Sequence, residues 1–186
     1  MANISLADHV MVFDDALSPA RCEALIDRFE VSAEREPCAR EQGHSFTQLD
    51  VTRHWPDESA ALIPVFLSCF KQYQFATNAG FWPPKFAFEH IRLKRYLPNG
   101  RDSFPTHVDV MCHDAARRFM TAILYLNAAD GGETVFPHLA LSIAPAPGKC
   151  IAFPPLWMFP HAGQPTVSKP KYILHTYLCY PASPQM

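Results

Sequence analysis

The sequence predicts a mainly β, α+β fold in which helices come first and a β-sandwich or jelly-roll core follows. The 186 residues include 18 prolines and only seven glycines. Because proline is excluded from helix interiors and central strands, prolines this frequent favour many short elements joined by turns. From Phe86 onward, short apolar runs alternate with Gly- and Pro-containing segments at nearly regular spacing, as is typical of sandwiches and jelly rolls.

Residues 1–80 are expected to form a helical support region. The segment 9–17 (HVMVFDDAL) predicts a first strand. Ser18 followed by Pro19 is typical of a helix start, because serine caps the free N–H groups and proline suits the first helical position. The following CEALIDRFEV has apolar side chains at helical spacing, which predicts an amphipathic helix.

A second helix is predicted from about Asp57 to Ala76, with Asp57 as a candidate cap and Pro64 as the site of a kink. Between the two helices, residues 34–54 are polar and irregular, with a short strand expected around 45–51. Neither that segment nor residues 111–118 carries a motif that identifies a partner or substrate.

Residues 81–181 are expected to form the β-core, and we expect residues 1–186 to make up one domain. Each apolar run in the core has the length of a strand. The runs are 86–97, 117–127, 133–136, 141–144, 149–153 and 171–180.

Composition excludes several classes of function. A net charge of −2 without any basic run argues against nucleic-acid binding. No apolar segment approaches the ~20 residues needed to cross a bilayer, and the N-terminus lacks the basic residues of a secretory signal. Six cysteines without any C-x-x-C spacing fit a reducing compartment. We therefore expect a cytoplasmic protein; its oligomeric state is not predicted.

A candidate metal site begins at SFPTHVDVM, where His107 and Asp109 lie two residues apart. In a strand these side chains share one face and could converge on one ion. The pair alone proves nothing, since His-x-Asp arises readily by chance and a structural hydrogen bond is the simpler explanation. His161, in FPHAGQPTV between two late strand signals, would complete a set of two histidines and one carboxylate. Such a facial triad suits non-haem Fe(II), because it leaves positions open for a co-substrate and O2.

A bidentate keto acid at such a metal would need a cation for its distant carboxylate. Lys171 begins the last apolar run, where an unpaired amine would be costly unless a bound carboxylate paired with it. Tyr96 and Tyr125, in neighbouring strand signals, could add hydroxyl donors, although a strand tyrosine also occurs simply as part of a core.

The ordered set of these segments resembles the Fe(II)- and 2-oxoglutarate-dependent dioxygenases, and within them the prolyl 4-hydroxylase branch. The resemblance covers essentially the whole chain. It is carried by VFDDALSPARCEALI, RYLPNGRDSFPTHVD, RFMTAILYLNAADGGETVFP, PGKCIAFPP and HAGQPTVSKPKYIL. GGET, between the metal pair and the distal histidine, makes this order far more specific than the triad alone.

The resemblance implies a double-stranded β-helix with flanking helices, and it implies the roles of six residues. His107, Asp109 and His161 would bind Fe(II), Lys171 would pair with the distal carboxylate of 2-oxoglutarate, and Tyr96 and Tyr125 would contact that co-substrate. It also implies a reaction with O2 that hydroxylates an unactivated C–H and releases succinate and CO2, with ascorbate as a further reductant. The substrate would be a prolyl or other amino-acid unit, in a small molecule, peptide or protein.

Several positions depart from the family or stay open. Lys169 stands where the family often has a glycine, so Lys169 and Lys171 both remain candidates for the carboxylate, with Lys171 favoured because it lies within the strand. His175 stands where many relatives have an arginine and is expected to line the pocket. Trp157 could wall the pocket or cap the core, and Arg92 could reach the pocket mouth or be exposed. His113-Asp114 and Glu41-x-x-His44 are interpreted as surface.

Two other classes of function remain open from the residues. One is a non-catalytic, cupin-like module that binds a metal or ligand or acts as a sensor. The other is a zinc-dependent hydrolase or lyase that uses the same three ligands. Lys171 argues against both, since neither needs a buried amine.

Overall fold

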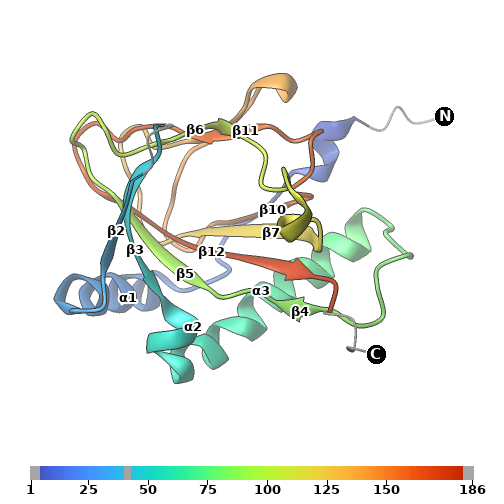
Figure 1. Ribbon diagram of the computed structural model, residues 1–186, viewed down its shortest axis with the longest axis horizontal. Helices are drawn as coiled ribbons and strands as arrows, with labels where there is room; N and C mark the ends of the chain where they lie inside the picture. Colours follow the sequence, from blue (N-terminus) through green and yellow to red (C-terminus); the bar gives the residue numbers. More distant parts are fainter. Residues whose placement is uncertain (1–4, 40–42, 182–186) are drawn as a thin grey trace.

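The computed structural model describes residues 5–39 and 43–181, and within these the strands form two antiparallel sheets (Figure 1). The large sheet has the order β1-β10-β7-β12-β5-β3-β2, with β4 paired to β12, and the small sheet has the order β6-β11-β8-β9. The strands are β1 Met11–Phe13, β2 Glu36–Ala39, β3 Ser45–Asp50, β4 Ala87–Phe88, β5 Arg92–Tyr96, β6 Phe104–His107, β7 Arg118–Tyr125, β8 Thr134–Phe136, β9 Leu141–Ile143, β10 Cys150–Phe153, β11 His161–Gly163 and β12 Lys171–Cys179. The helices are α1 Pro19–Val31, α2 Val51–His54 and α3 Pro56–Ala76, with 3-10 turns η1 Leu6–His9, η2 His113–Ala115 and η3 Pro137–Leu139.

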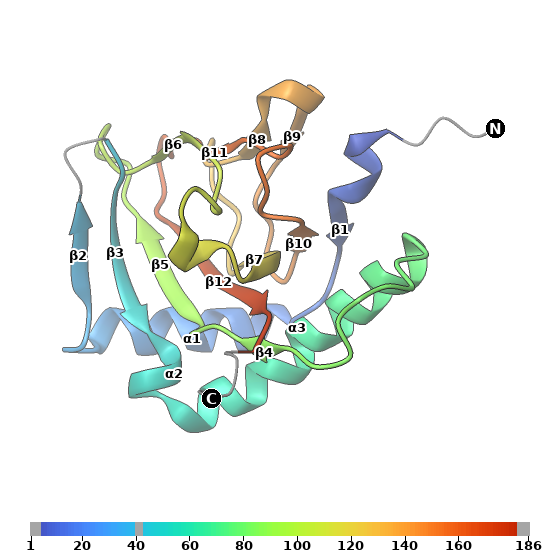
Figure 2. The same ribbon diagram turned by 45° about the vertical axis from the view of Figure 1, so that its right-hand side comes forward.

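The helices cover one face of the large sheet, and the small sheet lies over the other face (Figure 2). Apolar side chains therefore form two cores. The outer core packs α1 and α3 against the sheet through residues such as Phe29, Phe66 and Leu174. The inner core, between the sheets, includes Phe136 and Phe153. Both faces of β12 are thus covered, which explains why its sequence is almost continuously apolar.

The predicted helices begin as their sequences indicate. The Ser18 hydroxyl accepts a hydrogen bond from the Arg21 N–H, and Pro19 is the first residue of α1. The second helix, α3, begins at Pro56 rather than Asp57 and continues through Pro64 to Ala76. Within the described residues, no helix combines the length and the apolar character needed to cross a bilayer.

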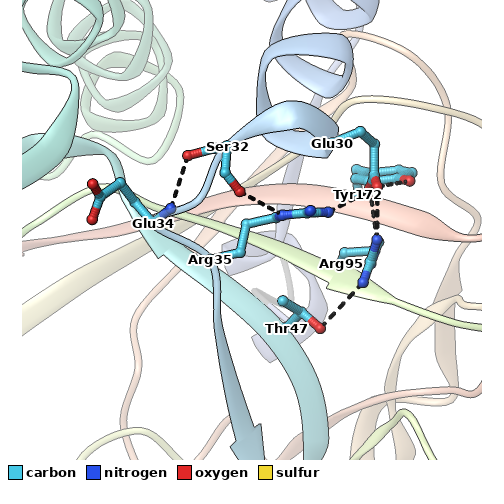
Figure 3. Close-up of polar contacts among 7 residues, drawn as sticks. All are labelled: Glu30, Ser32, Glu34, Arg35, Thr47, Arg95 and Tyr172. Atoms are coloured by element: carbon cyan, nitrogen blue, oxygen red, sulfur yellow. Dashed lines mark hydrogen bonds and ion pairs between the residues drawn. The ribbon is translucent and has the colours of Figure 1, made fainter.

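Glu30, near the end of α1, ties this helix to the large sheet (Figure 3). Its carboxylate accepts hydrogen bonds from Arg95 Nη1 at 2.8 and 3.0 Å and from the Tyr172 hydroxyl at 2.7 Å. Arg95 in β5 and Tyr172 in β12 therefore point toward the helices. Because side chains alternate along a strand, their neighbours Lys94 and Lys171 point toward the small sheet.

The fold class predicted from the sequence, a β-rich double-stranded β-helix behind N-terminal helices, is confirmed. Three local expectations were incomplete. The first strand covers only Met11–Phe13, preceded by a 3-10 turn. The segment 34–54 is more ordered than expected, since it forms β2, β3 and α2. Asp109 lies just beyond the last residue of β6, so a bend, and not strand alternation, brings it beside His107.

Candidate metal and co-substrate site

The small sheet brings two histidines from distant parts of the chain into contact. His107 ends β6, His161 begins β11, and the two residues are register partners in the antiparallel pair. Their ring centroids lie 4.3 Å apart. The bend after β6 then turns the Asp109 carboxylate toward both rings.

One ligand atom each from His107, Asp109 and His161 lies within 4.8 Å of the others, a spacing that suits a single shared ion. The carboxylate oxygens of Asp109 lie 3.3 Å from His107 Nε2 and 3.9 Å from His161 Nε2. The side chains of Asp109 and His161 are only 6% and 5% exposed, whereas that of His107 is 20% exposed. The cluster is therefore buried at Asp109 and His161 and is accessible to solvent on the side of His107.

The hydrogen bonds of the two rings show that a metal ion fits this cluster. His107 Nδ1 lies 2.9 Å from the carbonyl oxygen of Pro105, and His161 Nδ1 lies 3.1 Å from that of Phe159. A carbonyl only accepts, so each Nδ1 carries a proton, and Nε2 of each ring is left facing Asp109. Asp109 Oδ2 is buried and has no hydrogen-bond partner among the described residues. Two imidazole Nε2 atoms and a buried carboxylate that face one another are a donor set that a divalent cation would bind.

Burial and mutual charge keep these groups ready to bind a cation. Burial lowers the pKa of His161 to about 4, although Asp109 opposes this shift, so the ring is neutral near pH 7. Burial alone would raise the pKa of Asp109, but the neighbouring histidines hold it well below its usual range. A neutral imidazole and an ionised carboxylate are the protonation states that ligate metals.

Lys171 supplies a buried cation in the same pocket. The residue is 2% exposed, and its Nζ donates a hydrogen bond of 2.9 Å to the Gly132 carbonyl and lies 4.5 Å from the centre of the Tyr96 ring. Burial lowers the pKa of Lys171 to about 8, with Glu133 opposing. Lys169, the alternative predicted from the sequence, is exposed in the turn before β12. Lys169 lies outside the strand, and of the two candidate lysines only Lys171 lines the pocket.

Tyr125 and Tyr96 both line this pocket. The Tyr125 hydroxyl donates a hydrogen bond of 2.6 Å to Thr134 Oγ1, and Thr134 is the threonine of the GGET segment. Burial raises the pKa of both tyrosines well above the usual range, so both stay protonated and able to donate. Sequence reasoning noted GGET but not the role of Thr134 as the acceptor beside Tyr125.

The pocket that contains these groups has a volume of about 850 Å³ and opens between the two sheets. His175 lies on its wall, as expected, and so does Arg92, which the sequence left open between the pocket mouth and the exposed surface. Trp157 does not: it sits in the turn before β11, is 76% exposed, and neither walls the pocket nor caps the core. His113, predicted to be surface, is fully exposed.

Lys94 is the buried pocket residue that sequence reasoning missed. It lies in β5 and is 8% exposed, and its Nζ is 3.1 Å from His175 Nδ1. Sequence reasoning named Tyr96, which lies two residues further along the same strand face, but did not consider Lys94 beside it. Arg118 also lines the pocket and forms a two-point ion pair with Glu89, at 2.6 and 3.0 Å.

Comparison with protein families and solved structures agrees with this geometry. The family model described as the 2OG-Fe(II) oxygenase superfamily matches residues 91–179, which contain the triad, Lys94 and Lys171. No curated protein matches the chain.

Several solved prolyl hydroxylases share the fold. A viral collagen prolyl hydroxylase from Paramecium bursaria Chlorella virus-1, bound to 2OG, is 23% identical with a TM-score of 0.67, over 94% of this chain and 97% of that one. A Pseudomonas putida prolyl-4-hydroxylase is 21% identical with a TM-score of 0.68, over 95% and 97%. A Trichoplax adhaerens prolyl hydroxylase, in complex with a hypoxia inducible factor peptide fragment, is 13% identical with a TM-score of 0.73, over 92% and 84%.

Proposed function

We infer the reaction of this chain from its family, because through residues 91–179 it belongs to the 2OG-Fe(II) oxygenase superfamily. We propose that it hydroxylates an unactivated C–H bond: R–H + 2-oxoglutarate + O2 gives R–OH + succinate + CO2. One oxygen atom of O2 enters the alcohol and the other enters succinate, so the atoms balance. The observation that supports this most strongly is the three-ligand cluster sharing one pocket with the buried amine of Lys171.

His107, Asp109 and His161 would hold the metal ion, and a bound ferrous ion would supply the activation of O2. The protein supplies orientation. The Pro105 and Phe159 carbonyls hold the two imidazoles with Nε2 toward Asp109, where the three residues would hold the ion.

The other end of the pocket is suited to the distal carboxylate of 2-oxoglutarate. Lys171 offers an ammonium group, and the Tyr125 hydroxyl lies in the same lining with Thr134 beside it. The Gly132 carbonyl accepts one N–H of Lys171 and leaves two for a carboxylate. Burial excludes water from the Lys171 ammonium group, which makes an unpaired charge there unfavourable. Pairing with the carboxylate of 2-oxoglutarate would therefore stabilise both charged groups.

We propose a prolyl or other amino-acid unit as the substrate. The fold likeness to prolyl hydroxylases supports this, as does a pocket large enough to admit a side chain after the co-substrate has bound. The peptide bound to the Trichoplax relative supports an extended peptide as one form of that substrate.

The test is O2-dependent release of succinate from 2-oxoglutarate with Fe(II), in a screen of free amino acids and proline-containing peptides whose products are weighed by mass spectrometry. We expect His107→Ala and Asp109→Ala to lose metal binding and turnover while keeping the wild-type circular dichroism spectrum. His113→Ala, at a fully exposed histidine, is the matched control and should keep both.

Each alternative function has its own signature in the same assay. Turnover with Zn(II) and without 2-oxoglutarate would indicate a hydrolase or lyase. Metal and 2-oxoglutarate binding without succinate release under any condition would indicate a binding module. Near-wild-type turnover by either triad variant would show that the ligand assignment is wrong.

A cytoplasmic location and ascorbate as a reductant stay predictions. All six cysteines are free thiols, which supports a reducing environment. Faster decay of succinate release over successive turnovers without ascorbate than with it would support its role as a reductant.

A further inference from the structure

A second buried amine, Lys94, faces the same pocket as the triad and has no assigned role. Lys94 lies between Arg92 and Tyr96 on the inward face of β5 and is 8% exposed. Its Nζ lies 5.0 Å from the centre of the Phe46 ring and 5.9 Å from that of Phe104. Phe104 in turn stacks on His107 at 4.0 Å. The amine is therefore close to the metal ligands.

A hydrogen-bonded chain of two residues orients this amine. Lys94 Nζ donates to His175 Nδ1 at 3.1 Å, and His175 Nε2 shares a hydrogen bond of 2.9 Å with Thr121 Oγ1. An ammonium group can only donate, so His175 accepts at Nδ1 and is the neutral tautomer with its proton on Nε2. Burial and the charge of Lys94 keep the pKa of His175 well below its usual range, which agrees with this tautomer. One N–H of Lys94 is thus used and two remain for the pocket.

The charges in the pocket leave Lys94 without a counter-ion once the proposed reactants are bound. Among the described residues, the lining contains four Lys or Arg side chains and one carboxylate, Asp109. Arg118 forms an ion pair with Glu89, and the positive charge of Arg92 helps to lower the pKa of Asp50. A ferrous ion, doubly charged 2-oxoglutarate, Asp109 and Lys171 sum to zero, because +2, −2, −1 and +1 cancel. The ammonium group of Lys94 is the remaining buried charge.

We propose that Lys94 binds a carboxylate of the substrate, which makes this chain selective for amino-acid or peptide substrates with a free carboxylate close to the carbon that is hydroxylated. This inference rests on the proposed function and narrows its substrate class. His175 is a positioning residue that acts through Lys94. The carboxylate can be the α-carboxylate of a free amino acid or C-terminal residue, or the side chain of a neighbouring Asp or Glu.

The surroundings of Lys94 favour this role over a purely structural one. A buried ammonium group is strongly disfavoured unless it is paired, and the acceptor of Lys94 among the described residues is a neutral imidazole. The aromatic faces of Phe46 and Phe104 stabilise a cation only partly. A second site for 2-oxoglutarate is disfavoured, because Lys171, Tyr125 and Thr134 already form a matching set elsewhere in the pocket.

The experiment compares binding of acid and amide probes to the protein loaded with Mn(II) and 2-oxoglutarate, so that no turnover occurs. The probes are free amino acids including L-proline with their amides, a peptide ending in proline and the same peptide as its C-terminal amide, and an amidated peptide with Asp, or Asn in its place, beside an internal proline. Calorimetry gives each affinity in wild type, Lys94→Met, Lys94→Arg and the surface control Lys169→Met, and thermal unfolding checks that each variant folds.

We expect wild type and Lys169→Met to bind at least one carboxylate probe tenfold or more tightly than its amide. Lys94→Met should lose that preference while keeping its affinity for the amide, and Lys94→Arg should retain part of it. Tighter binding of the proline-terminated peptide than of the Asp peptide would assign the α-carboxylate, and the reverse order would assign the side chain.

The inference would be overturned by equal affinity of wild type for acids and amides, by an acid preference that survives in Lys94→Met, or by binding of none of the carboxylate probes. The inference would also be overturned if Lys94→Met lost as much affinity for 2-oxoglutarate as Lys171→Met, because the Lys94 amine would then bind the co-substrate. Failure of wild type to bind 2-oxoglutarate at all would instead refute the proposed function, so the two failures are distinguishable.

Discussion

Among single residues, Lys171 gives the sharpest test of co-substrate binding. Its ammonium group is buried and donates a hydrogen bond to the Gly132 carbonyl, so replacing Lys171 with the similarly sized, neutral Met should remove the pairing with 2-oxoglutarate but not the packing. We expect the Kd for 2-oxoglutarate to rise about 100-fold in Lys171→Met, or ~2.7 kcal/mol. Calorimetry with Mn(II) measures this.

Lys169→Met is the matched control, since Lys169 is an exposed lysine two residues away. Its Kd should stay within about twofold of wild type, because exposed charges contribute little. A large effect at Lys169 with none at Lys171 would reverse the assignment of the two lysines.

The same residue predicts how 2-oxoglutarate binding depends on pH. Burial lowers the pKa of Lys171 to about 8, so the amine is charged below that pH and increasingly neutral above it. A bound carboxylate favours the charged form and raises this pKa, so the affinity is full below pH 8 and falls as pH rises through it. Between pH 7 and pH 9 we expect the Kd to rise about tenfold.

The Kd of Lys171→Met should be nearly independent of pH over the same range. This control matters because burial also lowers the pKa of Lys94 to about 8. A pH dependence that persists in Lys171→Met would show that another group titrates.

The sequence was sufficient for some site residues and not for others. His107, Asp109, His161 and Lys171 could be named because their order along the chain matches a family, and the structure brings all four into one pocket. Lys94 was not named, because the resemblance assigns no role to that position, although strand alternation places it on the same face as Tyr96. The packing of α1 on Arg95 and the burial of Lys94 show that this face is enclosed.

Among the elements, the turn that contains Gly131 and Gly132 packs against the Lys171 side chain. Gly132 has φ +74°, and a Cβ there would lie 3.1 Å from Lys171 Cδ and 3.0 Å from Thr166 Cγ2. Gly132→Ala should therefore displace the lysine as well as strain the backbone. We expect a rise of about tenfold in the Kd for 2-oxoglutarate, and a loss of stability of about 1 kcal/mol or more.

Gly100→Ala separates these two effects. Gly100 has a similar φ of +71° but nothing within 4 Å of its Cβ position. It should lose a similar amount of stability in urea unfolding and keep its affinity for 2-oxoglutarate. Equal affinities in the two variants would show that the Gly132 turn does not position Lys171.

The elements that could be predicted are those whose side chains carry a strong pattern. β7 and β12 are long and buried on both faces, so their apolar runs were visible. β6 and β11 were not delimited, because they have four and three residues and carry proline, glycine and the metal ligands in place of apolar side chains. Strands this short are specified by their partners in the sheet more than by their own sequence.

For the whole molecule, the site joins the two sheets. The triad belongs to the small sheet and the bend beyond it, whereas Lys171 belongs to the large sheet. A 2-oxoglutarate molecule that contacts both the metal ion and Lys171 would connect the sheets across the inner core. Its binding should therefore be coupled to the metal and should stabilise the fold as a unit.

We expect Mn(II) and 2-oxoglutarate together to raise the thermal unfolding midpoint more than the sum of their separate effects. A ligand at 100 times its Kd adds about 2.7 kcal/mol to the free energy of unfolding, which for a chain of this size corresponds to about 5–10 °C.

Lys171→Met should keep the increase in unfolding midpoint caused by Mn(II), because its triad is intact, and lose most of the increase caused by 2-oxoglutarate. Asp109→Ala should lose both increases, since without the metal ion Lys171 is the one remaining group that pairs with the keto acid. If 2-oxoglutarate stabilised Asp109→Ala as much as wild type, the co-substrate would not bridge the metal and the lysine, and the coupling between the sheets would have to be abandoned.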